Sequence, residues 1–325
     1  MSSKISLKTK IKFPNVVNYL LMLGDGRICF SSVNDIYILN KNTFAPDIIE
    51  EKAHKKGINS LSQLEDGKLV SCASEPFLNI YNIEEKSLSL HQKIDVLSNI
   101  PKDLTKKFKY LFQATELINK DLAICGFFPV LTFFEYNSLK ELYDFKYYIY
   151  NPKDETIKYF KQINENQIIL VAYKTYNSIG HMGTHTKFKL CDLEKKEIRE
   201  KSIITSVGKF VGDSMCKISE NYLAIGVHKS ILIIDLKKLK KIEKYEIKDF
   251  FQNLCFFNNY LFCGSDQGII YKYIINEDIN GDKLELKDKI KLGEDMYINS
   301  LIKLNKKTMV FSQEATVFIY NLNEQ

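Results

Sequence analysis

The residues whose spacing comes nearest to a metal site are His181 and His185, in the run HMGTH. On a helix this i, i+4 spacing puts two imidazoles on one face, where they can bind zinc. Here Gly180 and Gly183 disfavour a helix, and neither a third ligand nor a general-base glutamate accompanies the pair. We therefore expect an exposed loop, within an insertion at about residues 175–186, and no metal.

Glycine-rich segments at residues 24–26 and 264–268 could cradle a phosphate. Each lies between two apolar segments, as a β-hairpin turn does, so the helix N-terminus that a phosphate cradle needs is missing. Residues 276–282 lack the terminal glutamate and the flanking helices of a calcium loop. Acidic pairs such as Glu84 with Glu85 fall in turns and are expected to be solvated. The sequence thus predicts no catalytic residue, no cofactor and no metal, and we expect a protein that is not an enzyme.

Cysteine usage and hydropathy bear on the compartment. The chain of 325 residues has seven cysteines and no C-x-x-C pair. An odd count in a chain of this size favours reduced, buried thiols over disulfides. No apolar run approaches the ~18 residues of a membrane span, and the first ten residues lack the apolar stretch of a signal peptide. We expect a cytoplasmic protein, with a nuclear location left open.

The net charge of +6 is carried almost entirely by lysine, because Arg27 and Arg199 are the only arginines among 46 basic residues. Arginine supplies the bidentate fork that recognises phosphates and guanine edges, whereas lysine is a hydrated point charge. This composition does not favour nucleic acid as the partner.

A short phrase recurs seven times: three apolar segments separated by polar or small turns, the third ending on Asn or Asp in six of the seven copies. These ends fall 39 to 55 residues apart, at Asn40, Asn82, Asn137, Asp192, Asp235, Ile274 and Asn321. The residues just before them are Leu39, Tyr81, Tyr136, Cys191, Ile234, Tyr273 and Tyr320. Asn, Asp or Gly stands in every turn between the first two segments, where tight hairpins need a positive φ.

Self-similarity at this period predicts a series of small stacked sheets. We expect an all-β fold, a seven-bladed β-propeller of four-stranded antiparallel blades, in a single domain of residues 1–325. The blades are expected at about residues 15–53, 57–95, 111–150, 156–205, 210–248, 251–292 and 297–325. The seventh unit is one strand short, and the alternating segment 3–13 is expected to supply its outer strand and close the propeller.

The chain resembles a seven-bladed WD40-repeat propeller across essentially its whole length. Ala53-His54 stands where WD40 repeats carry Gly-His, and Ser71, Glu75 and Tyr81 stand where the family has a buried Ser or Thr, an Asp and a Trp. The resemblance implies that His54, Ser71, Glu75 and Tyr81 form a hydrogen-bonded network that fixes the second blade. The chain departs from the family in having no tryptophan and in carrying the histidine in one unit only.

Two basic segments are candidate partner-binding sites. An insertion at residues 96–110 ends in Lys106, Lys107, Phe108, Lys109 and Tyr110, and a turn carries Lys237, Lys238, Lys240 and Lys241. Long loops on a rigid scaffold are where binding residues tend to lie. We expect the insertion to lie outside the sheets, so that the fold tolerates its replacement. A third feature is the aromatic segment 142–150, expected to be the outer strand of the third blade.

The resemblance implies a non-catalytic scaffold for protein–protein interaction, a monomeric propeller within a larger complex whose partners dock on propeller faces and inserted loops. The alternative is a lysine-rich propeller that binds RNA or anionic lipid headgroups. An enzyme would need several His, Asp or Glu residues at equivalent inner positions of different blades, and the inner segments carry mainly Val, Leu, Ile, Cys and Asn.

Overall fold

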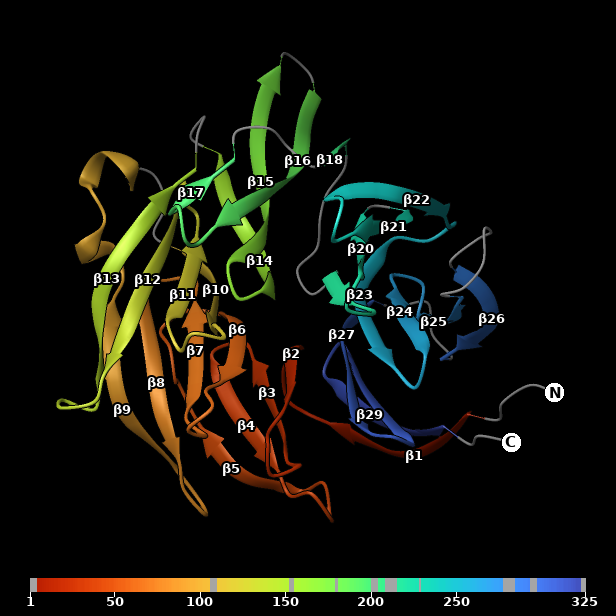
Figure 1. The fold of residues 1–325 in the computed structure, drawn as a ribbon. Helices are drawn as coiled ribbons and strands as arrows, with labels where there is room; N and C mark the ends of the chain where they lie inside the picture. The colour runs from red at the N-terminus through yellow and green to blue at the C-terminus, as the bar shows by residue number, and fades with distance from the viewer. Residues whose placement is uncertain are drawn as a thin grey trace. The chain divides into compact units, whose positions relative to one another are not determined.

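The computed structural model describes residues 5–105, 110–151, 155–178, 181–199, 204–207, 215–227, 229–276, 284–292 and 297–322. Within these ranges the strands form seven antiparallel sheets of four strands, one of them extended by a short fifth strand (Figure 1). The predicted all-β fold, a seven-bladed β-propeller, is confirmed. The described residues contain no helix long and apolar enough to cross a bilayer. The chain divides into two compact units, described here one at a time.

Unit 2 comprises Leu23–Val207. The first blade contributes β3 (Ile28–Ser32), β4 (Asp35–Leu39) and β5 (Pro46–Glu50), and the second is β6 (Ile58–Gln63), β7 (Leu69–Ala73), β8 (Phe77–Ile83) and β9 (Leu88–Asp95). The third is β10 (Leu111–Glu116), β11 (Leu122–Gly126), β12 (Val130–Asn137) and β13 (Leu142–Tyr150). The fourth is β14 (Thr156–Asn164), β15 (Gln167–Ser178), β16 (His181–Asp192) and β17 (Glu197–Ile198), and β18 (Ile204–Val207) also pairs with β16.

Unit 1 comprises Met1–Met22 and Gly208–Gln325. It holds β1 (Ile5–Lys12) and β2 (Val17–Met22), then the fifth blade of β19 (Met215–Lys217), β20 (Tyr222–Val227), β21 (Ser230–Asp235) and β22 (Lys240–Glu246). The sixth blade is β23 (Phe251–Phe257), β24 (Tyr260–Ser265), β25 (Ile269–Ile275) and β26 (Leu284–Lys291). The seventh contains β27 (Ile298–Asn305), β28 (Thr308–Gln313) and β29 (Thr316–Leu322).

The fourth strand of the seventh blade is β1, at the edge of the sheet beside β29. Leu7 faces Tyr320 and Ile11 faces Val317, with a β-bulge between Leu7 and Thr9. The backbone continues the contact past the strand, because the Phe13 amide donates to the Ala315 carbonyl at 2.7 Å. The predicted completion of the last blade by the N-terminal strand is therefore confirmed.

The repeated register corrects one position in the third blade. Opposite the first or second residue of each blade's second strand lie Leu39, Tyr81, Phe134, Cys191, Ile234, Tyr273 and Tyr320. The expectation of Tyr136 was wrong: Phe134 holds the repeat position and is 2% exposed, whereas Tyr136 is 40% exposed. The third strand of this blade runs on to Asn137 before it turns, so a count back from the asparagine lands two residues late.

Positive φ and side-chain acceptors both account for the turn residues: Gly26 and Gly67 have φ of 85° and 90° in the first and second blades, as predicted. At six of the first hairpin turns a side-chain oxygen accepts the backbone amide two residues later, from Asp25, Asp66, Asn119, Asn164, Ser219 and Asn305. In the remaining hairpin Asn258 and Asn259 have φ of 50° and 62°. The same kind of hydrogen bond is found where third strands end. There, a side-chain oxygen accepts the backbone amide two or three residues later, from Asn40, Asn137, Asp192 and Asp235. These polar residues are local turn formers in both places.

Neighbouring blades are joined by a recurring hydrogen bond that the sequence analysis did not identify. In three cases a side chain at or near the end of a blade's first strand accepts a hydrogen bond from a backbone amide in the first hairpin turn of the blade before it. The pairs are Gly24 with Gln63 at 2.7 Å, Glu65 with Glu116 at 2.6 Å and Ile118 with Gln162 at 2.9 Å. All three lie in unit 2, and they fix the turns of successive blades relative to one another.

The insertion predicted at residues 175–186 is strand, not loop. β15 and β16 are each 12 residues long and pair without a break from Gln167 opposite Asp192 to Ser178 opposite His181. Gly180 and Gly183 disfavour a helix, and glycines at these positions are also compatible with an extended hairpin. The side chains of His181 and His185 lie outside the described residues.

The cysteines behave as small apolar residues. All seven are free, and five of them, Cys29, Cys72, Cys125, Cys191 and Cys263, are buried. Burial raises the pKa of the Cys72 thiol to about 12, although the hydroxyl and backbone of Ser60 partly oppose that shift. Such thiols are packing groups and weak nucleophiles.

Candidate functional site

A buried hydrogen-bonded chain crosses the second blade. His54 lies in the loop before β6, Ser71 on β7 and Glu75 in the turn before β8. His54 Nδ1 is 2.6 Å from Glu75 Oε1, and its Nε2 is 2.7 Å from Ser71 Oγ. Because a carboxylate can only accept, Nδ1 carries the proton, and Nε2 accepts from the serine hydroxyl.

The order Ser–His–acid is also that of a nucleophilic triad. Burial lowers the pKa of His54, while the hydrogen bond and charge of Glu75 raise it, and the net shift is downward. A neutral imidazole could act as a base, but the Ser71 side chain is fully buried and no substrate atom can approach its Oγ. The chain therefore braces the blade, and its chemistry is closed to substrates.

Tyr81 lies outside this chain and holds the residue before His54. Its hydroxyl donates to the Ala53 carbonyl at 3.1 Å, and the Asn79 amide donates to the same carbonyl at 2.8 Å. Asn79 also donates to the Tyr81 hydroxyl at 3.0 Å. Of the four predicted network residues, three form one chain and the fourth holds the residue next to His54.

In the fourth blade, charged side chains hold the loop that precedes the first strand, β14. The sequence analysis did not identify this cluster. Lys189 on β16 stands two residues before the repeat position, as Asn79 does on β8. Its Nζ lies 2.7 Å from Glu155 Oε2 and donates to Asn151 Oδ1 at 2.8 Å. Lys187 pairs with the other carboxylate oxygen of Glu155. Lys189, Glu155 and Asn151 are all buried.

The electrostatics of this cluster are consistent with two lysines around one carboxylate. Burial alone would raise the pKa of Glu155, but Lys187 and Lys189 outweigh it and lower the pKa. The sequence did contain a signal for this cluster: the run KFK at residues 187–189 places two lysines in a third strand that is expected to be buried. A buried lysine is almost always paired with an opposite charge, so this run indicates a buried carboxylate nearby.

A cluster of four aromatic side chains forms the most distinctive described surface of unit 2. The aromatic patch consists of Tyr110, Phe112, Phe127 and Tyr173, each half-buried. Phe127 is at its centre, with ring centroids 6.5 Å from Tyr110, 6.1 Å from Phe112 and 6.1 Å from Tyr173, in edge-to-face arrangements. Lys56 Nζ lies 5.3 Å from the Tyr110 ring centroid, within cation–π range.

The aromatic patch rests on rigid elements. Tyr110 and Phe112 flank the start of β10, Phe127 occupies the turn between β11 and β12, and Tyr173 lies on β15. The Phe127 amide donates to the Tyr110 carbonyl at 2.8 Å, which ties the two residues together. Burial raises the pKa of Tyr173 to about 12, so its hydroxyl stays neutral at physiological pH. Such a surface can bury an apolar or cationic side chain from another molecule.

Of the predicted candidates at the end of the insertion, Tyr110 belongs to this patch. Lys106, Lys107, Phe108 and Lys109 lie outside the described residues.

The first part of the insertion lies outside the sheets, as expected, but it is not a free loop. Val96 and Ile100 are buried within the apolar core shared by the second and third blades, and Leu97 and Leu104 pack against it. Leu97 and Leu104 lie in two 3-10 turns, Leu97–Asn99 and Lys102–Leu104, and Val96 and Ile100 flank the first of these turns. The segment is a plug that completes this core.

The second predicted basic segment lies in unit 1. Asp235 Oδ1 accepts the amides of Lys237 at 2.9 Å and Lys238 at 2.8 Å, which shapes the turn between β21 and β22. Lys240 and Lys241 begin β22, and all four lysine side chains are exposed. The aromatic segment 142–150 is β13, as expected for an outer strand, and it exposes Phe145, Tyr148 and Tyr150.

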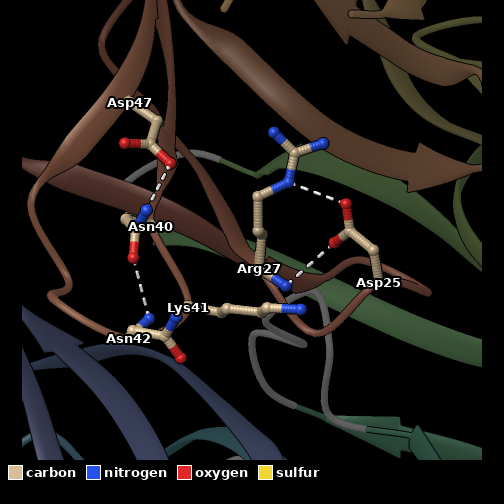
Figure 2. A pocket seen from close by; sticks show the side chains of 6 residues that line it. All are labelled: Asp25, Arg27, Asn40, Lys41, Asn42 and Asp47. Atoms are coloured by element: carbon tan, nitrogen blue, oxygen red, sulfur yellow. Dashed lines mark hydrogen bonds and ion pairs between the residues drawn. The ribbon is translucent and has the colours of Figure 1, made fainter. Parts of the chain in front are cut away.

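A pocket of about 190 Å³ opens at the turns of the first blade, between Asp25, Arg27, Asn40, Lys41, Asn42 and Asp47 (Figure 2). Arg27 Nε donates to Asp25 at 2.7 Å, and Asn40 donates to Asp47 at 3.0 Å. Partial burial would raise the pKa of Asp25, but the hydrogen bonds and charge of Arg27, with Lys41, lower it. The pocket's two carboxylates are engaged by their neighbours, so it offers no poised acid or base.

Among the described residues, no three His, Cys, Asp or Glu side chains form a group that could hold a metal ion. No protein-family model and no curated protein matches this sequence. The fold and the surfaces described above are therefore the basis for a functional proposal.

Proposed function

We propose that this protein is a non-catalytic protein-interaction scaffold of the WD40-repeat type, and that a partner docks on the aromatic patch. The observation that carries the proposal is the cluster around Phe127: partly buried aromatic rings held by strands and tight turns, with Lys56 at its border. Aromatic residues are enriched at the centres of protein interfaces because they bury a large area at little cost in side-chain entropy.

Two further observations support this proposal. The His54–Ser71–Glu75 chain occupies the positions at which WD40 repeats carry their bracing network. The charged and polar side chains buried in the second and fourth blades hold loops in place, and the Ser–His–acid set among them is sealed. These buried networks and the aromatic patch together are consistent with a rigid scaffold that has an apolar docking surface.

The test is quantitative affinity capture after crosslinking in native extract. Phe127→Ala removes the centre of the patch, and Tyr136→Ala removes a single exposed aromatic ring from the third blade as a matched control. We expect the wild type and Tyr136→Ala to capture the same partner in equal amounts, and Phe127→Ala to lose most of it while its melting temperature stays close to that of the wild type. Equal capture by all three proteins would contradict docking at this patch.

A further inference from the structure

Charge is distributed unevenly over the outer strands of the sheets. In unit 1 the outer strands β1, β22 and β26 together carry nine lysines and four carboxylates, a surplus of five positive charges. In unit 2 the outer strands β5, β9, β13 and β17 carry two lysines and five carboxylates, a surplus of three negative charges. The lysine excess is therefore specific to one set of sheet edges.

Two of the basic strands share a motif. Residues 8–12 on β1 read KTKIK and residues 287–291 on β26 read KDKIK. Successive side chains of a strand point to opposite faces, but each of these strands has a β-bulge, at Lys8 in β1 and at Lys287 in β26. The register therefore places Leu7, Lys10 and Lys12 on one face of β1, and Leu286, Lys289 and Lys291 on one face of β26. The isoleucines Ile11 and Ile290 are half-buried, whereas all six lysines are exposed. Each strand thus packs on its blade through the face that carries the isoleucine and presents two lysines and a leucine on the other face.

The basic strands belong to consecutive blades of unit 1. The Leu284 amide at the start of β26 donates to the Tyr245 hydroxyl on β22 at 2.9 Å. Ile290 of β26 packs against a core cluster that includes Leu322 of β29, the strand that pairs with β1. The three outer strands therefore lie on neighbouring blades, and together they are here called the lysine edge. The exposed Lys240 and Lys241 extend it toward the β21–β22 turn.

We propose that the lysine edge binds the surface of a bilayer that contains anionic lipids. Each lysine near such a surface adds a small electrostatic attraction, and an array of four to eight adds up to stable binding. The exposed apolar side chains of β1 and β26 are Leu7, 48% exposed, and Leu286, 43% exposed. Aliphatic side chains among lysines can enter the headgroup region.

Nucleic acid fits the same edge less well. Binding of single strands depends on aromatic side chains that stack on bases, and leucine cannot do this. Specific contacts to phosphates and guanine favour the bidentate guanidinium of arginine, and the lysine edge has no arginine. The chemistry therefore points to a diffuse anionic surface with an apolar interior. This proposal does not depend on docking at the aromatic patch, which is in unit 2.

The experiment is co-sedimentation of the full chain with vesicles of phosphatidylcholine alone or of phosphatidylcholine with phosphatidylserine. The test variant combines Lys10→Gln, Lys12→Gln, Lys287→Gln and Lys289→Gln. The control combines Lys52→Gln, Lys55→Gln, Lys86→Gln and Lys102→Gln, four exposed lysines of unit 2, and has the same net charge. Melting temperatures establish that both variants are folded.

We expect the wild type and the control to bind phosphatidylserine vesicles and not phosphatidylcholine alone, with binding that weakens as salt is added. The test variant should bind at least about tenfold more weakly. Leu7→Ser with Leu286→Ser should weaken the binding that remains at high salt. Equal binding to both vesicle types, equal loss in the control, or retention of polyuridylate or polyglutamate without vesicle binding would each overturn the proposal.

Discussion

At the scale of single residues, the second and fourth blades hold the loop before their first strand with different side chains. In the second blade, neutral hydrogen bonds from Asn79 and Tyr81, with the His54–Glu75 pair, hold the loop that leads into the inner strand. In the fourth blade, Lys189 from the position equivalent to Asn79 holds the corresponding loop through Glu155 and Asn151. What is repeated is the position on the third strand, and the residue type is free to change.

The second-blade network predicts the effect of Glu75→Ala. Without the carboxylate, the Nδ1 proton of His54 has no acceptor in a buried site, which should lower the free energy of unfolding by about 1–3 kcal/mol. Urea denaturation measures this. Glu85→Ala, which changes a solvent-exposed carboxylate of the same blade, should leave the stability unchanged. Equal stability of Glu75→Ala and the wild type would mean that the chain does not brace the blade.

The charged cluster predicts a larger loss. Glu155→Gln leaves the buried ammonium of Lys189 without its counter-charge and should cost about 3–5 kcal/mol. Adding Lys189→Met removes the stranded charge, so the double variant should recover much of the loss. Glu135→Gln, at an exposed carboxylate 3.5 Å from Lys146, serves as the control and should be close to neutral. A double variant no more stable than Glu155→Gln alone would argue against this pairing.

The elements show how far the sequence could predict the fold and where it failed. The strands and their order within each blade could be predicted from alternation and turn residues, because both signals are local. The completing role of β1 could be predicted by counting, because the seventh unit is one strand short and an alternating segment precedes the first unit. The position of Phe134 could not, because asparagines mark where a strand turns and say nothing of its register with the strand beside it. The Lys189–Glu155 pair and the aromatic patch join residues far apart in sequence, so no spacing rule identifies them.

If residues 96–104 form part of the core, a substitution in this segment should lower the free energy of unfolding, which a substitution in a free loop would not do. Ile100→Ala would leave a cavity in the core between the second and third blades and should cost about 2–5 kcal/mol. Leu139→Ala, at a side chain that is 96% exposed, should cost nothing measurable. Denaturant titration of the two variants decides between the assignments, and equal stability would mean that the segment is peripheral to the core.

At the scale of the whole molecule, the seventh blade links the two ends of the chain. β1 pairs with β29 from Ile5 opposite Leu322 to Lys12 opposite Thr316. Deletion of residues 1–13 would expose the edge of β29, which should lower the melting temperature sharply and promote aggregation. Calorimetry and light scattering measure both effects. A truncated protein that melts with the wild type and stays monodisperse would show that β1 contributes little to the blade.

The account's central claim, a scaffold with a partner on the aromatic patch, is tested most directly by site-specific photo-crosslinking in native extract. A photoreactive side chain replaces Lys56, which borders the patch and leaves all four rings intact, or Tyr136 as the control position. The account predicts that Lys56 yields one abundant adduct with another protein, that Phe127→Ala abolishes this adduct, and that Tyr136 does not produce it. No adduct at Lys56, or the same adduct from both positions, would contradict it.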